Sequence, residues 1–337
     1  MPAGGIQGLP GEFELISRYF APLSKGFPGA FGLRDDAAVI RPASGRDLVA
    51  KTDAIVGGVH FLSDDPPDLV ARKALRVNLS DLAAKGAVPR AYMLDLMLPR
   101  DIQEAWIAAF ARGLAEDQAE FGIHLIGGDT DSTPGPISIA IMAFGEVDIG
   151  RMIRRDGARA GDKIYVTGTI GDAALGLAAL KAKLPGLNPA SAQFLIGRYR
   201  LPSPPVRLGP RLVGLATASI DISDGLIADL RHVCEASAVA ADIRSDHVPL
   251  SAPARSILAE DPGALRTVLS GGDDYQILFT AGPAAGGKIT DLALELGVSI
   301  TAIGEVTSWS GQRDQRITVL DAKGHPLMLG SEGWTHF

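Results

Sequence analysis

Aspartates are the residues of this sequence best placed to do chemistry, because they fall at turns and at the ends of predicted strands instead of over helix faces. Ten occupy such positions: Asp35, Asp36, Asp53, Asp81, Asp129, Asp131, Asp221, Asp224, Asp273 and Asp274. Carboxylates gathered in one site repel one another unless cations lie between them, and Mg²⁺ held by carboxylates and substrate phosphates is a common arrangement. Aspartate beside glycine also forms good turns. Each position alone is open to either interpretation, but the set favours metal binding.

The segment IDISDGLIADL, residues 221–231, carries the sharpest local pattern. We expect Asp221 to end a strand, Ser223 to cap the following helix and Asp224 to lie in its first turn, where negative charge is favoured. A plain helix-capping motif is the alternative interpretation. Capping alone does not require Asp221, so the segment favours a ligand site.

Several weaker patterns have two interpretations each. The glycine turn GTIGDAALGL (168–177) suits phosphate at a helix start, but it lacks the Gly-Lys-Ser/Thr of a Walker sequence, and a tight strand-to-helix turn is favoured. Asn78 and Asp81 share one face of a predicted helix. His60 contacts a substrate or is a neutral loop residue. The pair Arg154 and Arg155 contacts phosphate or lies in a solvated turn.

A covalent nucleophile is not indicated. The sequence has no Gly-x-Ser-x-Gly and no zinc-type spacing of Cys and His, and its one cysteine, Cys234, lies in a predicted helix. A single cysteine excludes an intrachain disulfide, and this fits a reducing cytoplasm.

The elements that position these residues alternate between strands and helices, which predicts an α/β (or α+β) protein in two mixed domains. The charged, turn-rich segment 150–163 predicts the boundary, so the expected domains are 1–150 and 151–337. Predicted strands are 37–42, 47–56, 91–99, a short strand ending at 127–130, 137–147, 163–168, 218–223, 271–281, 298–306 and 317–320. Predicted helices are 12–20, 68–86, 101–121 with Asp101 as its cap, 171–180 and 224–236.

The composition narrows the class of partner. The chain has 337 residues, 46% of them hydrophobic and 21% charged, enough for two packed cores. A net charge of -7 argues against binding to nucleic acid or to a membrane surface, both of which need basic patches. The first residues lack the basic and apolar regions of a signal peptide, and no apolar run approaches a membrane span. We therefore expect a cytoplasmic protein.

The motifs as a set resemble the thiamine-monophosphate kinase family. GEFELISRYF (11–20), LRDDAAVI (33–40), TDAIVGGVHF (52–61), KALRVNLSDLAAKGAVP (73–89), LIGGDTD (125–131), YVTGTIGDAALGL (165–177), IDISDGLIADL (221–231) and LSGGDDYQILFT (269–280) occur in the family's order and spacing. The resemblance covers residue 11 to the C-terminal GWTHF. The wider superfamily includes the aminoimidazole ribonucleotide and selenophosphate synthetases.

The resemblance implies an ATP-dependent kinase that converts thiamine monophosphate to thiamine diphosphate. It implies a homodimer in which N-terminal domains pair their sheets, with ATP and several Mg²⁺ ions held between the domains. As magnesium ligands it implies Asp36, Thr52, Asp53, Asp81, Asp129, Asp221 and Asp224. As ATP contacts it implies Gly128, Asp129, Arg155 and Ser223, and as thiamine-phosphate contacts His60, Asp273 and Trp334.

Three positions depart from the family pattern. Arg34 stands where the first acidic pair is usually preceded by glycine, and Lys51 stands where serine often precedes Thr-Asp. Asp273 replaces a glutamate and is one methylene shorter. These departures leave the implied metal ligands intact. Two other functions stay open: a superfamily synthetase that activates an amide or a selenide, and a nucleotide-binding regulator without catalysis.

Overall fold

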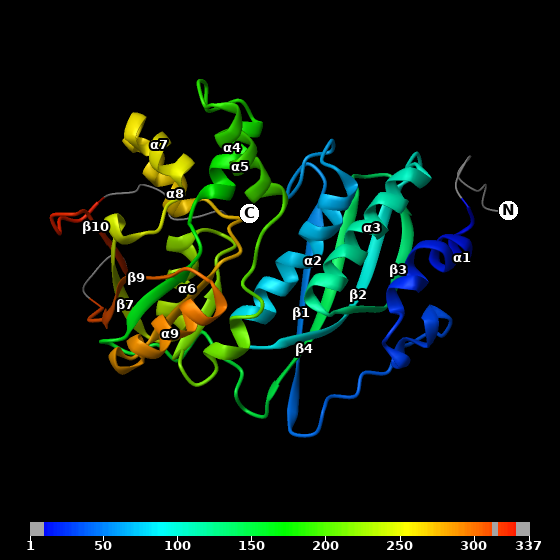
Figure 1. Cartoon of the computed structure of the whole chain (residues 1–337), viewed down its shortest axis with the longest axis horizontal. Coiled ribbons are helices and arrows are strands. Elements are labelled where there is room, and N and C mark those ends of the chain that lie inside the picture. The colour runs from blue at the N-terminus through cyan, green and yellow to red at the C-terminus, as the bar shows by residue number, and fades with distance from the viewer. Residues whose placement is uncertain (1–9, 312–315, 328–337) are drawn as a thin grey trace. The chain divides into compact units, whose positions relative to one another are not determined.

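The computed structural model describes residues 10–311 and 316–327. The chain forms two compact units by its internal contacts. Unit 1 comprises Met1–Leu82 with Val88–Gly150, and unit 2 comprises Ala83–Ala87 with Arg151–Phe337. Both units mix strands and helices, as the sequence predicts (Figure 1).

Unit 1 is built on a four-stranded sheet in the order β1-β4-β2-β3. Its strands are β1 (Arg46–Val56), β2 (Val88–Pro99), β3 (His124–Thr133) and β4 (Ser138–Asp148). β4 pairs antiparallel with both β1 and β2, whereas β3 runs parallel to β2. The helices α2 (Pro67–Ala84) and α3 (Glu104–Phe121) lie against one face of this sheet (Figure 1).

Strand alternation gives the sheet of unit 1 two different faces. In β4, Ile139 and Ile141 are buried on the helix side, while Met142 between β1 and β2 is 43% exposed on the other side. Cross-strand partners share a face, so Thr52 lies with Met142 on the exposed side. This outer face is largely apolar, which is unusual for a surface facing water.

Two local predictions for unit 1 are wrong. Residues 37–42 form no strand; the Val39 amide donates to the Gly29 carbonyl instead, and Pro42 has no amide to offer a ladder. The helix predicted from 101 begins at Glu104, with Gln103 rather than Asp101 at the cap position. The N-terminal helix predicted over 12–20 is present as α1 (Glu12–Leu15), followed by wider and then tighter helical turns over 16–24.

Unit 2 is built on a six-stranded sheet in the order β10-β7-β9-β5-β8-β6. Its strands are β5 (Lys163–Thr167), β6 (Ala218–Asp221), β7 (Val239–Arg244), β8 (Ile277–Ala281), β9 (Ile300–Ser308) and β10 (Ile317–Leu320). Its helices are α4 (Asp172–Leu180), α5 (Pro189–Arg200), α6 (Leu226–Ala236), α7 (Ala252–Glu260), α8 (Leu265–Ser270) and α9 (Gly286–Leu296).

This sheet is buried on both faces. Ile164 and Val166 of β5 join the core that contains Leu230 of α6. Tyr165, between them, points the other way and joins the core that contains Ile289 and Leu292 of α9. The sheet therefore lies between two layers of helices. Over the described residues, no helix is long and apolar enough to cross a membrane.

Candidate functional site

Lys51, Asp53 and Asp81 form a charged cluster in unit 1. Lys51 and Asp53 are two residues apart on β1 and therefore face the same side, and α2 brings Asp81 to them. The Lys51 Nζ lies 3.1 Å from an Asp53 oxygen and 2.8 Å from an Asp81 oxygen. Burial raises the pKa of Asp53; Lys51 opposes this rise, and the neighbouring Asp81 carboxylate adds to it. Burial would lower the pKa of Lys51, but the two carboxylates more than offset it, so that pKa is raised.

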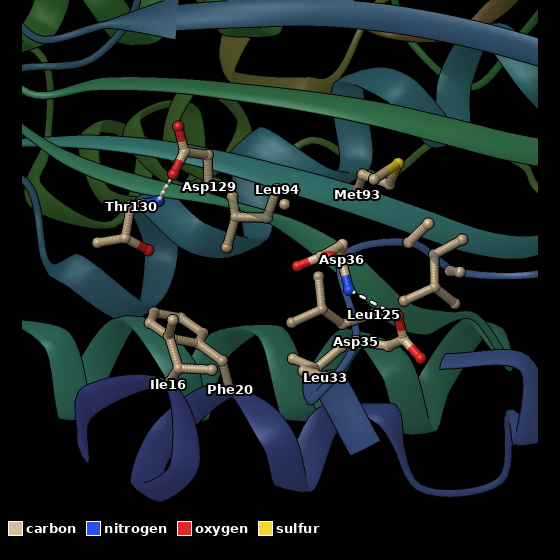
Figure 2. Close-up of a pocket in the computed structure, with 15 residues that line it drawn as sticks. Ile16, Phe20, Leu33, Asp35, Asp36, Met93, Leu94, Leu125, Asp129 and Thr130 are labelled. Carbon is tan, nitrogen blue, oxygen red and sulfur yellow. Dashed lines mark hydrogen bonds between the residues drawn. The ribbon is translucent and has the colours of Figure 1, made fainter. Parts of the chain in front are cut away.

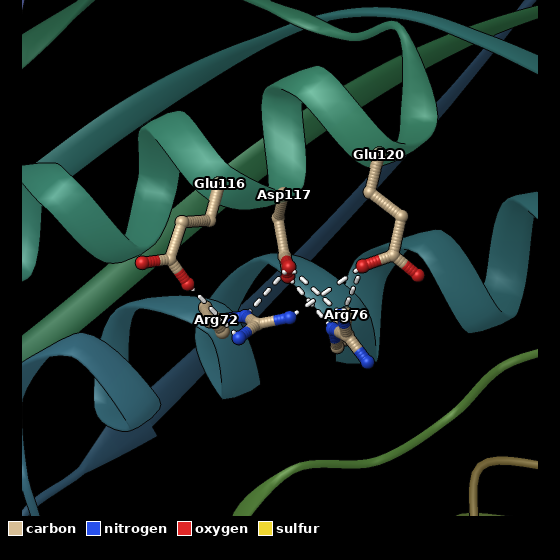
Figure 3. A network of polar contacts seen from close by, with 5 residues as sticks. All are labelled: Arg72, Arg76, Glu116, Asp117 and Glu120. Atoms are coloured by element: carbon tan, nitrogen blue, oxygen red, sulfur yellow. Dashed lines mark hydrogen bonds and ion pairs between the residues drawn. The ribbon is translucent and has the colours of Figure 1, made fainter.

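The helix that carries Asp81 is held by a buried ion-pair network (Figure 3). Asp117 of α3 is fully buried and accepts hydrogen bonds from Arg72 at 2.7 Å and from Arg76 at 2.7 and 2.9 Å. The exposed Glu116 and Glu120 pair with the same arginines. Since Arg72 and Arg76 precede Asp81 on α2, the network fixes the helix that presents Asp81.

A second acidic group borders a cavity of about 130 Å³ in unit 1. Its lining includes Asp35, Asp36, Gly128 and Asp129. In Figure 2, Ile16 and Phe20 of the N-terminal segment face Leu94 and Asp129 across this cavity. The cavity thus has an apolar wall and a carboxylate rim, which is the pattern of a site for an amphipathic ligand held through cations.

Backbone geometry at the rim requires glycine at position 128. Its φ is 143°, and a Cβ there would lie 1.8 Å from the carbonyl oxygen of Leu94 on β2. Asp129 lies inside β3 and not at the end of a strand, because β3 continues to Thr133. Asp95, which no sequence pattern singles out, is the β2 partner of Asp129. Only the strand register reveals that pairing.

Thr52 and Asp53 are adjacent but lie on opposite faces of β1, since strand side chains alternate. Thr52 is exposed on the apolar outer face. Asp53 points to the helix side with Lys51. The family resemblance implies both residues as metal ligands, and the structure brings only Asp53 to Asp81.

His60 follows β1 in a tight turn. The Val56 amide donates to its Nδ1 at 3.0 Å, and the buried Lys73 donates to its carbonyl oxygen at 2.9 Å. Because Nδ1 accepts a hydrogen bond, the other ring nitrogen carries the proton in the neutral side chain. The imidazole is therefore oriented by the backbone at the end of the strand.

In unit 2, two loops that are distant in sequence run side by side. The Asp273 amide donates to the Ser223 carbonyl at 2.9 Å, and the Tyr275 amide donates to the Ile222 carbonyl at 2.7 Å. A Cβ on Gly272 would lie 2.1 Å from the Ser223 oxygen, so only glycine permits this approach. Asp221, Ser223, Asp224 and Asp273 are thereby gathered at one edge of the sheet.

The segment 273–275 is strained. Asp273 and Tyr275 have φ values of 71° and 50°, which non-glycine residues rarely adopt. The Tyr275 hydroxyl donates to the Asp273 carboxylate at 3.1 Å. Strain of this kind is concentrated at functional sites, which agrees with the prediction that this segment binds a ligand.

Asp229 is a site-forming residue that the sequence patterns did not reveal. It is buried in α6, and its Oδ2 accepts hydrogen bonds from the amides of Ser223, Asp224 and Gly225 at 3.0, 3.0 and 3.2 Å. Burial and the nearby Asp224 raise the pKa of Asp229 to about 7. The predicted cap is wrong: α6 begins at Leu226, and the amides before it are bound by Asp229 instead of Ser223. The sequence signal that could have revealed this role is the position of Asp229 four residues after Gly225.

The carboxylate of Asp274, from the segment before β8, lies at the start of α4. It is buried and accepts from the Gly171 amide at 2.7 Å and from the Ala173 amide at 3.4 Å. Burial raises the pKa of Asp274 well above its ordinary value. The amides that could have bound a phosphate at this helix start are thus taken by a carboxylate, which supports the interpretation of 168–177 as a tight turn.

The remaining predicted contacts are Arg155 and Trp334. Arg155 is exposed in unit 2, and its carbonyl accepts from the Ser237 hydroxyl at 2.9 Å. Arg154 pairs with Asp156 at 2.5 Å. Trp334 lies outside the described residues. Among the residues that are described, no group of three or more His, Cys, Asp or Glu side chains gathers closely enough to hold a metal ion by itself.

Comparisons with known proteins place this arrangement in a family. Residues 34–147 match the model of the AIR synthase related protein, N-terminal domain, and residues 159–314 match that of the AIR synthase related protein, C-terminal domain. A thiamine-monophosphate kinase of Escherichia coli K12 is 43% identical over 97% of this chain and 98% of its own length. One of Caulobacter vibrioides is 40% identical over 97% of this chain and 91% of its own.

Solved structures agree. A thiamine-monophosphate kinase from Stenotrophomonas maltophilia is 39% identical, with a TM-score of 0.78 over 85% of this chain and 89% of that one. The structure described as AaThiL complexed with AMPPCP and TMP is 30% identical, with a TM-score of 0.76 over 97% of both chains.

Proposed function

This chain belongs to the thiamine-monophosphate kinase family, and from that premise we propose that it transfers the γ-phosphoryl group of ATP directly to the phosphate of thiamine monophosphate. The products are thiamine diphosphate and ADP. The match to the Escherichia coli kinase over 97% of this chain carries the proposal. The relative described with AMPPCP and TMP supports the two substrates. We expect the protein to act in the cytoplasm.

The acceptor explains why the chain needs no general base. A phosphate monoester has a second pKa near ~6 and is mostly a dianion at neutral pH. It is already nucleophilic, so the difficulty is to bring two polyanions together in line. Positioning and neutralisation of charge dominate such reactions. Cys234 is buried, and burial raises the pKa of its thiol to about 12, which removes it as a nucleophile.

We propose that the carboxylates hold Mg²⁺ together with the substrate phosphates. Bound Mg²⁺ would neutralise the negative charge of the phosphates. The donor chemistry fits: Asp53 and Asp81 already converge on one cation, the Lys51 ammonium. Mg²⁺ is commonly bound by one or two carboxylates plus phosphates, so a pair of aspartates suffices when the substrate phosphates supply further ligands. The proposed ligands are Asp36, Thr52, Asp53, Asp81, Asp129, Asp221 and Asp224.

The remaining contacts are proposed from the family resemblance. The nucleotide is assigned to Gly128, Asp129, Arg155 and Ser223. Gly128 and Asp129 line the cavity of unit 1, and Ser223 belongs to the loop that Asp229 holds. Thiamine monophosphate is assigned to His60, Asp273 and Trp334.

Product analysis tests the reaction. With ATP, Mg²⁺ and thiamine monophosphate, mass spectrometry should find thiamine diphosphate and ADP in equal amounts. ATP consumption without a phosphorylated thiamine would favour a synthetase-type activity, and the absence of single-turnover consumption would favour a regulator. With chirally labelled γ-phosphate, a single in-line displacement inverts configuration at phosphorus. Retention, or a trapped acyl phosphate, would rule out direct transfer.

We propose that two copies of the chain pair through the outer face of the sheet in unit 1. Met97, at 36% exposure, and Met142, at 43%, lie on this face with Ala50 and Ala54 of β1. A contiguous exposed apolar face indicates an interaction surface. Met142→Glu should convert a dimer to a monomer in analytical ultracentrifugation, whereas the edge substitution Arg46→Glu should not. A monomeric wild-type chain would refute the pairing.

A further inference from the structure

Lys51 is placed where a cation is needed. Strand alternation puts its side chain on the same face of β1 as Asp53, and α2 brings Asp81 to the same ammonium. The Nζ lies 3.1 Å from Asp53 and 2.8 Å from Asp81. The Asp81 side chain is only 12% exposed and that of Lys51 30%, so water screens this cluster incompletely.

Two carboxylates that contact the same ammonium lie close together, and both can be charged at low cost only when a cation is bound to them. In this structure, Lys51 supplies that charge from within the chain. The same two carboxylates are those assigned to Mg²⁺ above, so the role of Lys51 rests on that part of the proposed function. A divalent ion bound to both carboxylates has to take the place of the ammonium.

We propose that Lys51 is a tethered counter-ion that holds Asp53 and Asp81 together in the metal-free protein and competes with Mg²⁺ for them. The pair is thereby kept in position before any metal arrives. Mg²⁺ alone binds weakly, because it must displace a charge that cannot diffuse away. Nucleotide phosphates change the balance: they add oxygen ligands for the metal and give the displaced ammonium an anion to pair with. Lys51 thus couples metal binding at this pair to nucleotide binding.

The test measures Mg²⁺ binding without nucleotide, in the whole chain, by isothermal titration calorimetry. Lys51→Met should bind Mg²⁺ on the order of tenfold more tightly than wild type, because the competing charge is gone. Its melting temperature in EDTA should fall below that of wild type, and its rise on adding Mg²⁺ should be larger. Lys51→Arg, which keeps a cation, should stay close to wild type.

Arg46→Met is the matched control, because it removes a cation from another ion pair of the same strand, Arg46 with Asp148. It should leave the affinity for Mg²⁺ unchanged. Lys51→Gln serves as a second neutral variant. If Lys51→Met does not fold in EDTA but folds when Mg²⁺ is added, the proposal is supported. The affinity for Mg²⁺ is then measured on Lys51→Gln.

Equal or weaker Mg²⁺ binding by both neutral variants would overturn the proposal, as would an unchanged melting temperature in EDTA. Failure of the metal assignment is recognised separately. If wild type and both neutral variants bind no Mg²⁺ in the absence of nucleotide, yet the wild type forms thiamine diphosphate, Asp53 and Asp81 are not an independent metal site and the role of Lys51 falls with them.

Discussion

Asp117→Asn should destabilise unit 1 by about 3 kcal/mol, although Asp117 is not itself a predicted ligand. Asp117 is fully buried and accepts three hydrogen bonds from two arginines, of which Arg76 has a side chain only 5% exposed. Removing one partner of a buried ion pair costs ~3–5 kcal/mol, because the other charge stays buried. Glu120 still contacts both arginines, so the lower end of that range is expected.

The measurement is unfolding by differential scanning calorimetry, with urea titration followed by circular dichroism. For a unit of this size 1 kcal/mol corresponds to ~2–4 °C in melting temperature, so a loss of about 6–12 °C is expected in the transition of unit 1. Glu116→Gln is the control: it removes one bond from a side chain that is 47% exposed, and an exposed pair contributes only ~0.2–1 kcal/mol.

A loss below about 1 kcal/mol for Asp117→Asn would refute the reasoning. It would mean that Glu116 and Glu120 satisfy both arginines without Asp117, and that the network does not fix α2. Equal losses for Asp117→Asn and Glu116→Gln would refute it too, since burial would then not decide the cost.

The remaining predictions concern the site. Asp53→Asn and Asp81→Asn should each abolish turnover while circular dichroism stays unchanged; near-normal turnover at saturating Mg²⁺ would show that the substituted residue is not a required ligand. Asp229→Ala leaves three amides before α6 without their acceptor, so kcat/KM for ATP should fall by roughly 10-fold or more, each lost charged hydrogen bond being worth ~1.5–3 kcal/mol; an unchanged kcat/KM would contradict its positioning role. Trp334→Ala should raise KM for thiamine monophosphate several-fold and leave KM for ATP nearly constant. The reason is that the positively charged thiazolium ring of thiamine, stacked over an indole, gains ~0.5–2 kcal/mol. Equal changes in both KM values would indicate a structural role.

Local sequence patterns determined much of the fold. The helical spacing of Ile107, Phe110 and Leu114 predicts α3, and all three are buried. The apolar run 137–147 predicts β4, found at Ser138–Asp148. These predictions succeed because amphipathic periodicity is a property of neighbouring residues, which choose the same face wherever the core lies.

The ends of elements were harder to predict from sequence. Asp101 and Ser223 are good cap residues by type, yet α3 and α6 begin later. At α6 a buried carboxylate within the helix, Asp229, satisfies the preceding amides. A capping pattern shows which residues could accept these hydrogen bonds, but the competition among acceptors is settled by the path of the chain.

The sequence by itself determined which residue types carry the chemistry, namely many aspartates at turns and no activated nucleophile. It also determined the family to which the chain belongs. Only the tertiary structure decided which of these residues meet. It brought Asp273 beside Ser223 across 50 residues of chain and Asp81 beside Asp53, with the Lys51 ammonium in contact with both carboxylates. The physical reason is that such contacts depend on strand register and helix packing, which join residues far apart in sequence and leave no periodic trace in either segment alone.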